Sequence, residues 1–209
     1  MVKEAEKTLG KPLCVAGFRI FQAALERGVR SKVLADVLQI IELAPLFSPM
    51  TPYGRKMSVQ MTSAGRLGWY SDRSGYRYAE RHPSGTTWPQ IPASVLEIWQ
   101  AFLPDAPPPD SCLVNYYGEG ARMGLHQDRD EGDFSFPVLS VSLGDDALFR
   151  MGGTVRRGKT SSVWLKSGDV VVIGGAARLA YHGIDRIRFG SSSLVPGGGR
   201  INLTLRVVR

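Results

Sequence analysis

The chain has 209 residues, of which 43% are hydrophobic, and it carries a formal net charge of +7. This composition is enough for a sizeable buried core and excludes a largely disordered chain. The mixed charges of residues 1–7 and the lack of a long apolar run argue against a signal peptide or a membrane anchor, so we expect a cytoplasmic protein with no membrane partner. Two cysteines are too few for a disulfide framework. The positive charge favours polyanionic partners without identifying them.

The first half of the chain is expected to be partly helical. Ser31 can cap a helix whose apolar residues, from Val33 to Ile41, repeat at helical spacing and which ends before Pro45. A second, short helix is predicted to start near Pro92, with Val95, Leu96, Trp99 and Phe102 on one face. A proline-rich stretch over residues 104–109 then stops it. These apolar stripes are typical of core packing.

After residue 110 the pattern changes to short strands separated by glycines and charged turns. The predicted strands cover residues 112–117, 138–143, 147–151, 162–165, 170–173, 179–182 and 201–208. Several short strands at such spacing predict a sandwich or a barrel, and the jelly roll is the member of that class that often carries a metal between its sheets. The helices would pack outside one sheet.

Two of the three histidines are candidates for a metal site. His126 and Asp128 form an HxD motif, and His182 follows much later in the chain, after several predicted strands. Two imidazoles and one carboxylate on one face suit a mononuclear iron(II) site, because they leave coordination positions open. These three ligands alone are equally compatible with zinc or with a cupin-like site. Taken by itself, His182 would more commonly be a buried core histidine.

The last predicted strand alternates strictly between polar and apolar residues. Its polar face consists of Arg200, Asn202, Thr204 and Arg206. Such alternation usually means a half-exposed strand. However, Asn115 and Tyr117 form a second polar pair on another predicted strand, and guanidinium groups bind carboxylates in a bidentate manner. A dicarboxylic co-substrate beside the metal would use all of these groups.

Residues 53–82 interleave cations with aromatic residues. The cations are Arg55, Lys56, Arg66, Arg73, Arg77 and Arg81, and the aromatic residues are Tyr53, Trp69, Tyr70, Tyr76 and Tyr78. Cations that bind phosphates, next to rings that stack on bases, are the two components of a site for a single strand or a flipped base. Ordinary core or turn residues explain this segment equally well when it is considered alone.

Together these motifs resemble the AlkB family of Fe(II)- and 2-oxoglutarate-dependent dioxygenases, which oxidatively remove alkyl groups from nucleic-acid bases. The likeness runs from about Thr51 to Arg206 and is closest to the bacterial repair enzymes of the family. It is carried by the Asn115-x-Tyr117, His126-x-Asp128, His182 and Arg200-x-Asn202-x-x-x-Arg206 motifs, and by segments 57–59, 67–69, 126–131, 141–144 and 202–204.

The resemblance implies an α+β fold with a double-stranded β-helix, or jelly-roll, core. The core would cover residues 112–209. Residues 1–45 would form an N-terminal extension and helix, and residues 46–90 would form a nucleotide-recognition lid. All three would form a single catalytic domain in a monomeric protein. The iron ligands would be His126, Asp128 and His182.

The resemblance also implies a co-substrate site for 2-oxoglutarate. Its residues would be Asn115, Tyr117, Arg200, Asn202 and Arg206. Among them, Arg206 would bind the distal carboxylate, Asn115 and Tyr117 would donate hydrogen bonds to the same molecule, and Arg200 and Asn202 would complete the pocket.

The implied reaction is oxidative repair of N-alkylated bases of the 1-methyladenine or 3-methylcytosine type in single- or double-stranded DNA. It would consume O2 and release succinate, CO2 and an aldehyde. A cationic methylated base favours an aromatic face and a nearby carboxylate. The expected substrate residues are Trp69, Tyr76, Asp130, Met61 and Arg156.

Several alternatives stay open at this point. Asp130 could instead orient the metal ligands or lie in a surface turn. Arg55 stands where the bacterial repair enzyme has an aromatic residue, which puts the grip on the nucleotide backbone in doubt. An RNA or tRNA demethylase or hydroxylase of the same family is the main functional alternative, because cationic steering does not separate DNA from RNA. A small-molecule or protein hydroxylase of the same architecture would lack the Trp69 and Tyr76 base site, and the intact triad disfavours a non-catalytic binding module.

Overall fold

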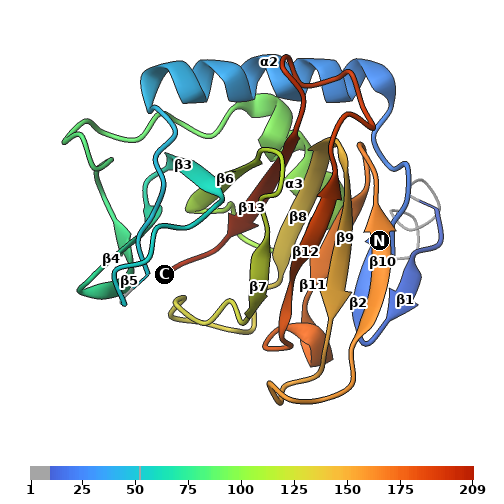
Figure 1. Cartoon of the computed structure of the whole chain (residues 1–209). Coiled ribbons are helices and arrows are strands. Elements are labelled where there is room, and N and C mark those ends of the chain that lie inside the picture. Colours follow the sequence, from blue (N-terminus) through green and yellow to red (C-terminus); the bar gives the residue numbers. More distant parts are fainter. Residues whose placement is uncertain (1–9, 52) are drawn as a thin grey trace.

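The structure is a computed structural model that describes residues 10–51 and 53–209. Its larger sheet has seven strands in the order β1-β2-β11-β8-β13-β6-β3, and its smaller sheet has four in the order β10-β9-β12-β7 (Figure 1). The larger sheet contains β1 (Leu13–Val15), β2 (Phe18–Phe21), β3 (Gln60–Gly65), β6 (Ser111–Tyr117), β8 (Val138–Gly144), β11 (Val170–Ile173) and β13 (Arg200–Arg206). The smaller sheet contains β7 (Met123–His126), β9 (Asp146–Met151), β10 (Ser161–Leu165) and β12 (His182–Arg188).

Two helices and a hairpin complete the described part of the chain. The helices are α2 (Arg27–Leu43) and α3 (Ala93–Phe102), and a short 3-10 turn, η1 (Gly175–Ala177), follows β11. Strands β4 (Gly68–Asp72) and β5 (Gly75–Ala79) form a separate two-stranded hairpin. In Figure 1 this hairpin lies at the left, away from β9–β12, while α2 runs along the top. None of the helices described is long and apolar enough to cross a membrane.

Each face of the larger sheet has its own apolar cluster. One cluster joins Val33, Val37 and Trp99 of the helices to Val141 and Leu203 of the larger sheet. The other contains residues of both sheets, including Ile20 and Val171 of the larger sheet and Phe149 of the smaller one. The two sheets therefore pack face to face, and the helices cover the outer face of the larger sheet. This arrangement confirms the predicted jelly roll with helices outside one sheet.

The helices are where the sequence predicts them, but details differ. Helix α2 begins at Arg27, one turn before the predicted cap Ser31, and its N-cap residue Glu26 makes no side-chain cap. A tertiary contact sets this start, because the Leu25 amide donates to the carbonyl of Gly168. Helix α3 follows Pro92 as predicted, but Leu96 is 37% exposed and Ile98 is buried in its place.

The strand predictions after residue 110 hold within one or two residues, with one exception. The segment 179–182 is not a strand, since β12 begins at His182 and runs on to Arg188. The sequence patterns also missed β1–β5 and β7. Strands β1, β2 and β3 all join the larger sheet, so the sheet extends beyond the segment 112–209 that was expected to form it. Hairpin β4–β5 is the part of segment 46–90 that stands apart from both sheets.

Candidate metal and co-substrate site

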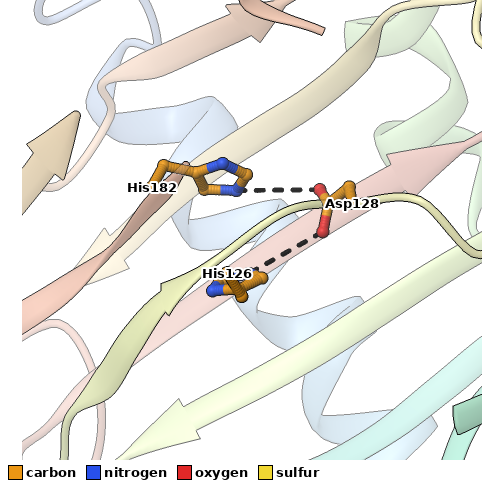
Figure 2. A group of neighbouring side chains, drawn as sticks. All are labelled: His126, Asp128 and His182. Carbon is orange, nitrogen blue, oxygen red and sulfur yellow. Dashed lines mark ion pairs between the residues drawn. The ribbon is translucent and has the colours of Figure 1, made fainter. Parts of the chain in front are cut away.

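The two histidines and the aspartate of the HxD motif come together at the edge of the smaller sheet. His126 at the end of β7 is paired in register with His182 at the start of β12. Asp128 follows β7, and its two carboxylate oxygens each lie 3.7 Å from the Nε2 atom of one histidine (Figure 2). The potential ligand atoms of the three residues lie within 4.8 Å of one another. Within residues 10–51 and 53–209, no other group of histidine, cysteine and acidic residues has this geometry.

Backbone contacts orient both imidazole rings. The Nδ1 atoms of His126 and His182 lie 3.0 Å from the carbonyl oxygens of Gly124 and Ala180, respectively. A proton on Nδ1 is donated to each carbonyl, which leaves the Nε2 lone pairs directed toward Asp128. A Cβ atom at Gly183 would lie 2.5 Å from the carbonyl oxygen of Met123, so glycine is needed for β7 to approach β12 here.

The charges at this centre suit a divalent cation. Burial lowers the pKa of His182 to about 4, so the ring is neutral and can act as a ligand. Burial opposes ionisation of Asp128, but Arg206 and the two histidines outweigh it and hold the pKa of this carboxyl well below its usual range. Oxygen Oδ2 of Asp128 is buried without a hydrogen-bond partner among the described residues. Two imidazoles and one carboxylate, with such an orphaned oxygen, fit iron(II).

A second polar group lies on the central strands of the larger sheet. Register pairs bring its members together, because Asn202 and Arg200 of β13 lie opposite Asn115 and Tyr117 of β6. Residues opposite each other in an antiparallel pair point to the same face. Together with Thr204 and Arg206, these side chains line the same cavity as the triad, whose volume is about 520 Å³.

The polar face of β13 is buried, which excludes a half-exposed strand. Arg200 is only 1% exposed, and its Nη2 atom donates to Ser142 Oγ at 3.0 Å. Its Nε and Nη1 atoms have no hydrogen-bond partner in the described chain, and neither does Oδ1 of Asn115. Burial lowers the pKa of Arg200 to about 10, which still leaves it cationic near neutral pH. An unpaired buried guanidinium is costly, so the pocket fits an anionic ligand.

Arg206, at the other end of β13, contacts the metal centre. Its Nη2 atom lies 2.9 Å from Asp128 Oδ1, and its Nε atom lies 3.2 Å from Glu131 Oε1. Its Nη1 atom is buried without a partner in the part of the chain described. The two arginines therefore lie at different ends of the cavity. Arg206 is beside the candidate iron ligand Asp128, whereas Arg200 contacts Ser142 and is paired in register with Tyr117.

The aromatic residues expected to contact a base lie at the exposed end of this cavity. Trp69 of β4 and Tyr76 of β5 are stacked, with ring centroids 5.5 Å apart and an interplanar angle of 20°. Tyr76 is 49% exposed. The Nε1 atom of Trp69 donates to Asp130 Oδ2 at 2.9 Å, so this carboxylate orients the indole ring. Met61, which is buried, and Arg156, which is exposed, also line the cavity.

Of the six cations in segment 53–82, half are engaged by nearby groups. Arg66 pairs with Asp110, Arg77 pairs with Asp72, and Arg81 donates to the carbonyl of Gly85. Arg55 is exposed, and its backbone amide donates to Thr51 Oγ1. Pro52, in the same loop, lies outside the described residues. The third histidine, His82, contacts Ser84 Oγ and the carbonyl oxygen of Pro45, outside the metal centre.

The sequence patterns missed a buried charge network beside the metal centre. Glu131 accepts hydrogen bonds from Arg178 Nη2 at 3.0 Å and from the Tyr78 hydroxyl at 2.6 Å. Arg178 also donates to the backbone oxygen of Asp128 at 2.7 Å. Glu131 lies in segment 126–131, which carries part of the family resemblance. This is the only feature of the sequence that could have drawn attention to Glu131. Arg178 and Tyr78 are distant in the sequence, and no spacing rule connects them to Glu131.

The comparisons with known proteins agree with this geometry. The model of the 2OG-Fe(II) oxygenase superfamily matches residues 17–206. The alpha-ketoglutarate-dependent dioxygenase AlkB homolog of Caulobacter vibrioides is 55% identical over 203 residues, which cover 96% of this chain and 92% of the relative. The alpha-ketoglutarate-dependent dioxygenase AlkB of Escherichia coli is 41% identical over 181 residues, covering 84% and 83% of the two chains.

A solved structure matches the fold as well as the sequence. The structure of OsALKBH1 superimposes with a TM-score of 0.77 at 32% identity, covering 93% of this chain and 98% of that chain. The match of the family model, the similarity to the two bacterial relatives and the shared jelly roll all lead to one assignment. The chain belongs to the AlkB family of the 2OG-Fe(II) oxygenase superfamily and is an Fe(II)- and 2-oxoglutarate-dependent dioxygenase.

Proposed function

We propose that this dioxygenase repairs DNA by oxidative removal of alkyl groups from ring nitrogens of its bases, of the 1-methyladenine and 3-methylcytosine type. The observation that carries the proposal is the shared cavity. The metal triad, an unpaired buried guanidinium and a stacked Trp69–Tyr76 pair all line it. A small-molecule hydroxylase has no need for two stacked rings at the exposed end of its site.

In this proposal His126, Asp128 and His182 are the iron ligands. Bound Fe(II), with 2-oxoglutarate and O2, supplies the oxidising power that hydroxylates the alkyl carbon, and the hydroxyalkyl group then leaves as an aldehyde. The two carbonyl contacts to Nδ1 keep the rings in position without iron, so little rearrangement is needed on binding. Arg206 compensates the charge of Asp128 and keeps this carboxylate ionised.

The positions of the two arginines favour an exchange of the roles that the family resemblance assigned to them. Arg200 has free donors and is not paired with any carboxylate of the described chain, so it would bind the distal carboxylate of 2-oxoglutarate. Tyr117 pairs with Arg200 in register, and burial raises the pKa of its hydroxyl to about 12, which keeps it a hydrogen-bond donor. Arg206 would instead contact the carboxylate end nearer iron, with Asn115 and Asn202 between the two arginines.

At the exposed end, the cationic base would stack on Trp69, opposite His126. A methylated, positively charged ring gains from an aromatic face, and extrusion of an unpaired base costs less than that of a paired one. Asp130 has a dual role in this proposal, because it fixes the indole ring and places negative charge near the base. Met61 would form part of the apolar floor, and Arg156 would bind a substrate phosphate.

We further propose that the protein acts as a cytoplasmic monomer with one catalytic domain. In support, both cysteines are free, as expected in a reducing compartment. Light scattering coupled to size-exclusion chromatography would give the mass of one chain, 22.9 kDa, if the monomer is correct.

The test of the proposed reaction is an aerobic assay with Fe(II), 2-oxoglutarate and matched DNA and RNA oligomers, each with one 1-methyladenine or 3-methylcytosine. We expect formaldehyde and the unmodified base from DNA, both measured by mass spectrometry. The control is Asp128→Asn, which keeps the shape of the side chain but removes the carboxylate, and it should bind oligomers without repairing them. Neither product from any methylated DNA would refute the proposal, and faster turnover of RNA would reassign the substrate to the RNA alternative.

A further inference from the structure

The recognition hairpin β4–β5 contacts two consecutive acidic residues next to the metal centre. Trp69 and Tyr78 lie opposite each other in the hairpin register, so both side chains point to the same face. Trp69 Nε1 donates to Asp130 Oδ2 at 2.9 Å, and the Tyr78 hydroxyl donates to Glu131 Oε1 at 2.6 Å. The hairpin is therefore bound at two adjacent points to the segment that follows the iron ligand Asp128.

The two contacts differ in what lies behind them. Asp130 is exposed, whereas Glu131 is buried and also accepts from Arg178 Nη2. Arg178 donates to the backbone oxygen of Asp128, and Arg206 lies between the side chains of Glu131 and Asp128, at 3.2 Å and 2.9 Å. Glu131 is thus connected to Asp128 by two arginines.

The Tyr78 hydroxyl is well suited to a permanent hydrogen bond. Burial, together with the negative charge of Glu131, raises the pKa of this phenol well above its ordinary value, so it stays protonated and donates. Its short bond to a carboxylate is of the charge-assisted type, which is about twice as strong as a neutral one. Tyr76, by contrast, is half exposed and stacks on Trp69, where it is available to a substrate.

From this arrangement we infer that Tyr78 is a positioning residue, which holds the substrate-stacking hairpin over the metal centre through Glu131. Its hydroxyl does not touch the base. It holds Trp69 in place beside the iron ligands, so that the stacking face is already formed when a base binds and binding pays less to order it. The effect of Tyr78 on base binding rests on the proposed function. The anchoring of the hairpin by Tyr78 is independent of it.

The test compares Tyr78→Phe with a matched control, Tyr70→Phe, on the adjacent strand. The Tyr70 hydroxyl has no hydrogen-bond partner within residues 10–51 and 53–209, and the ring instead faces Arg77. Amide hydrogen exchange is measured on the full chain loaded with Fe(II) and 2-oxoglutarate without oxygen, and again without either. In Tyr78→Phe, exchange of the β4 and β5 amides should be about tenfold faster, the effect of one lost charge-assisted hydrogen bond, while β13 is unchanged.

Kinetics separate positioning from a merely structural role. We expect the KM for a methylated oligomer to rise about tenfold in Tyr78→Phe, with kcat and the Kd for 2-oxoglutarate changed less than about twofold, because Glu131 keeps both arginines. The control should match the unmodified protein in every measurement. Hairpin exchange equal to that of the control would overturn the inference, as would a large loss of kcat at constant KM. If methylated oligomers are not substrates at all, the exchange data still decide whether Tyr78 anchors the hairpin.

Discussion

Replacement of Arg200 by methionine should separate the stability of the protein from its affinity for 2-oxoglutarate. Arg200 is buried and has Ser142 Oγ as its hydrogen-bond acceptor, so it is an incompletely compensated buried cation when no ligand is bound. Methionine fills a similar volume without the charge. Since a well-packed apolar residue often replaces a buried charge without loss, we expect the ligand-free variant to be at least as stable as the unmodified protein.

The affinity should change in the opposite direction. Loss of one member of a buried charge pair costs about 2 to 5 kcal/mol, and a value of about 3 kcal/mol corresponds to an increase in Kd of roughly 100-fold. A concentration of 100 times the original Kd stabilises the unmodified protein by about 2.7 kcal/mol, but the variant by only about 0.4 kcal/mol. For a chain of this size, these values correspond to a rise in Tm of about 5 to 10 °C and of about 1 °C, respectively.

The assay is thermal unfolding with Mn(II) in place of iron, with and without 2-oxoglutarate, supported by calorimetric titration. Arg30→Met is the matched control, because Arg30 is a partly buried arginine that donates to the Ser167 carbonyl and does not line the cavity. A further comparison uses 2-oxobutyrate, which lacks the distal carboxylate, and Arg200→Met should bind the two acids almost equally. The reasoning is refuted if Arg200→Met still prefers 2-oxoglutarate to 2-oxobutyrate. It is also refuted if Arg206→Met, with Arg200 intact, loses that preference.

Three further substitutions test other parts of the structure. Trp69→Ala should raise the KM for a methylated oligomer by about tenfold to 100-fold, since base stacking is worth about 1 to 3 kcal/mol, and an unchanged KM in steady-state kinetics would exclude stacking. Leu203→Ala, in the core beneath the helices, should lower the free energy of unfolding in urea by about 2 to 5 kcal/mol, and a loss below 1 kcal/mol would contradict its complete burial. Asp110 accepts from Arg66 and from two backbone amides, and these hydrogen bonds, working against burial, lower its pKa from 3.8. The ionised carboxylate should therefore contribute about 1 kcal/mol to the free energy of unfolding above pH 4, and this contribution should fade as the pH falls through the lower folded-state pKa. The unfolding curves of Asp110→Asn and of the unmodified protein should differ at pH 7 and converge below pH 4.

The periodicity of the sequence was sufficient where one face of an element is uniformly apolar. Strands β6, β8, β9, β10, β11 and β13 have this property, and their bounds were predicted within one or two residues. Strands β3 and β7 gave no such pattern, because β3 consists mostly of small or polar residues and β7 has only four residues. Their pairing with β6 and β12 becomes visible only in the tertiary structure. The start of α2 likewise depends on a contact with Gly168, which no local signal reveals.

The sequence by itself determined the chemical groups of the site. The HxD motif, the distant His182 and the polar face of the last strand are each visible in the order of residues, and strand alternation places Arg200 and Arg206 on one face. Only the tertiary structure decided how these groups are used. It pairs Arg206 with Asp128, leaves Arg200 without a carboxylate partner among the described residues, and joins Tyr78, Arg178 and Glu131 into one network. The physical reason is that a charge acts over a few ångströms in space, and in a jelly roll the residues within that distance come from strands far apart in the chain.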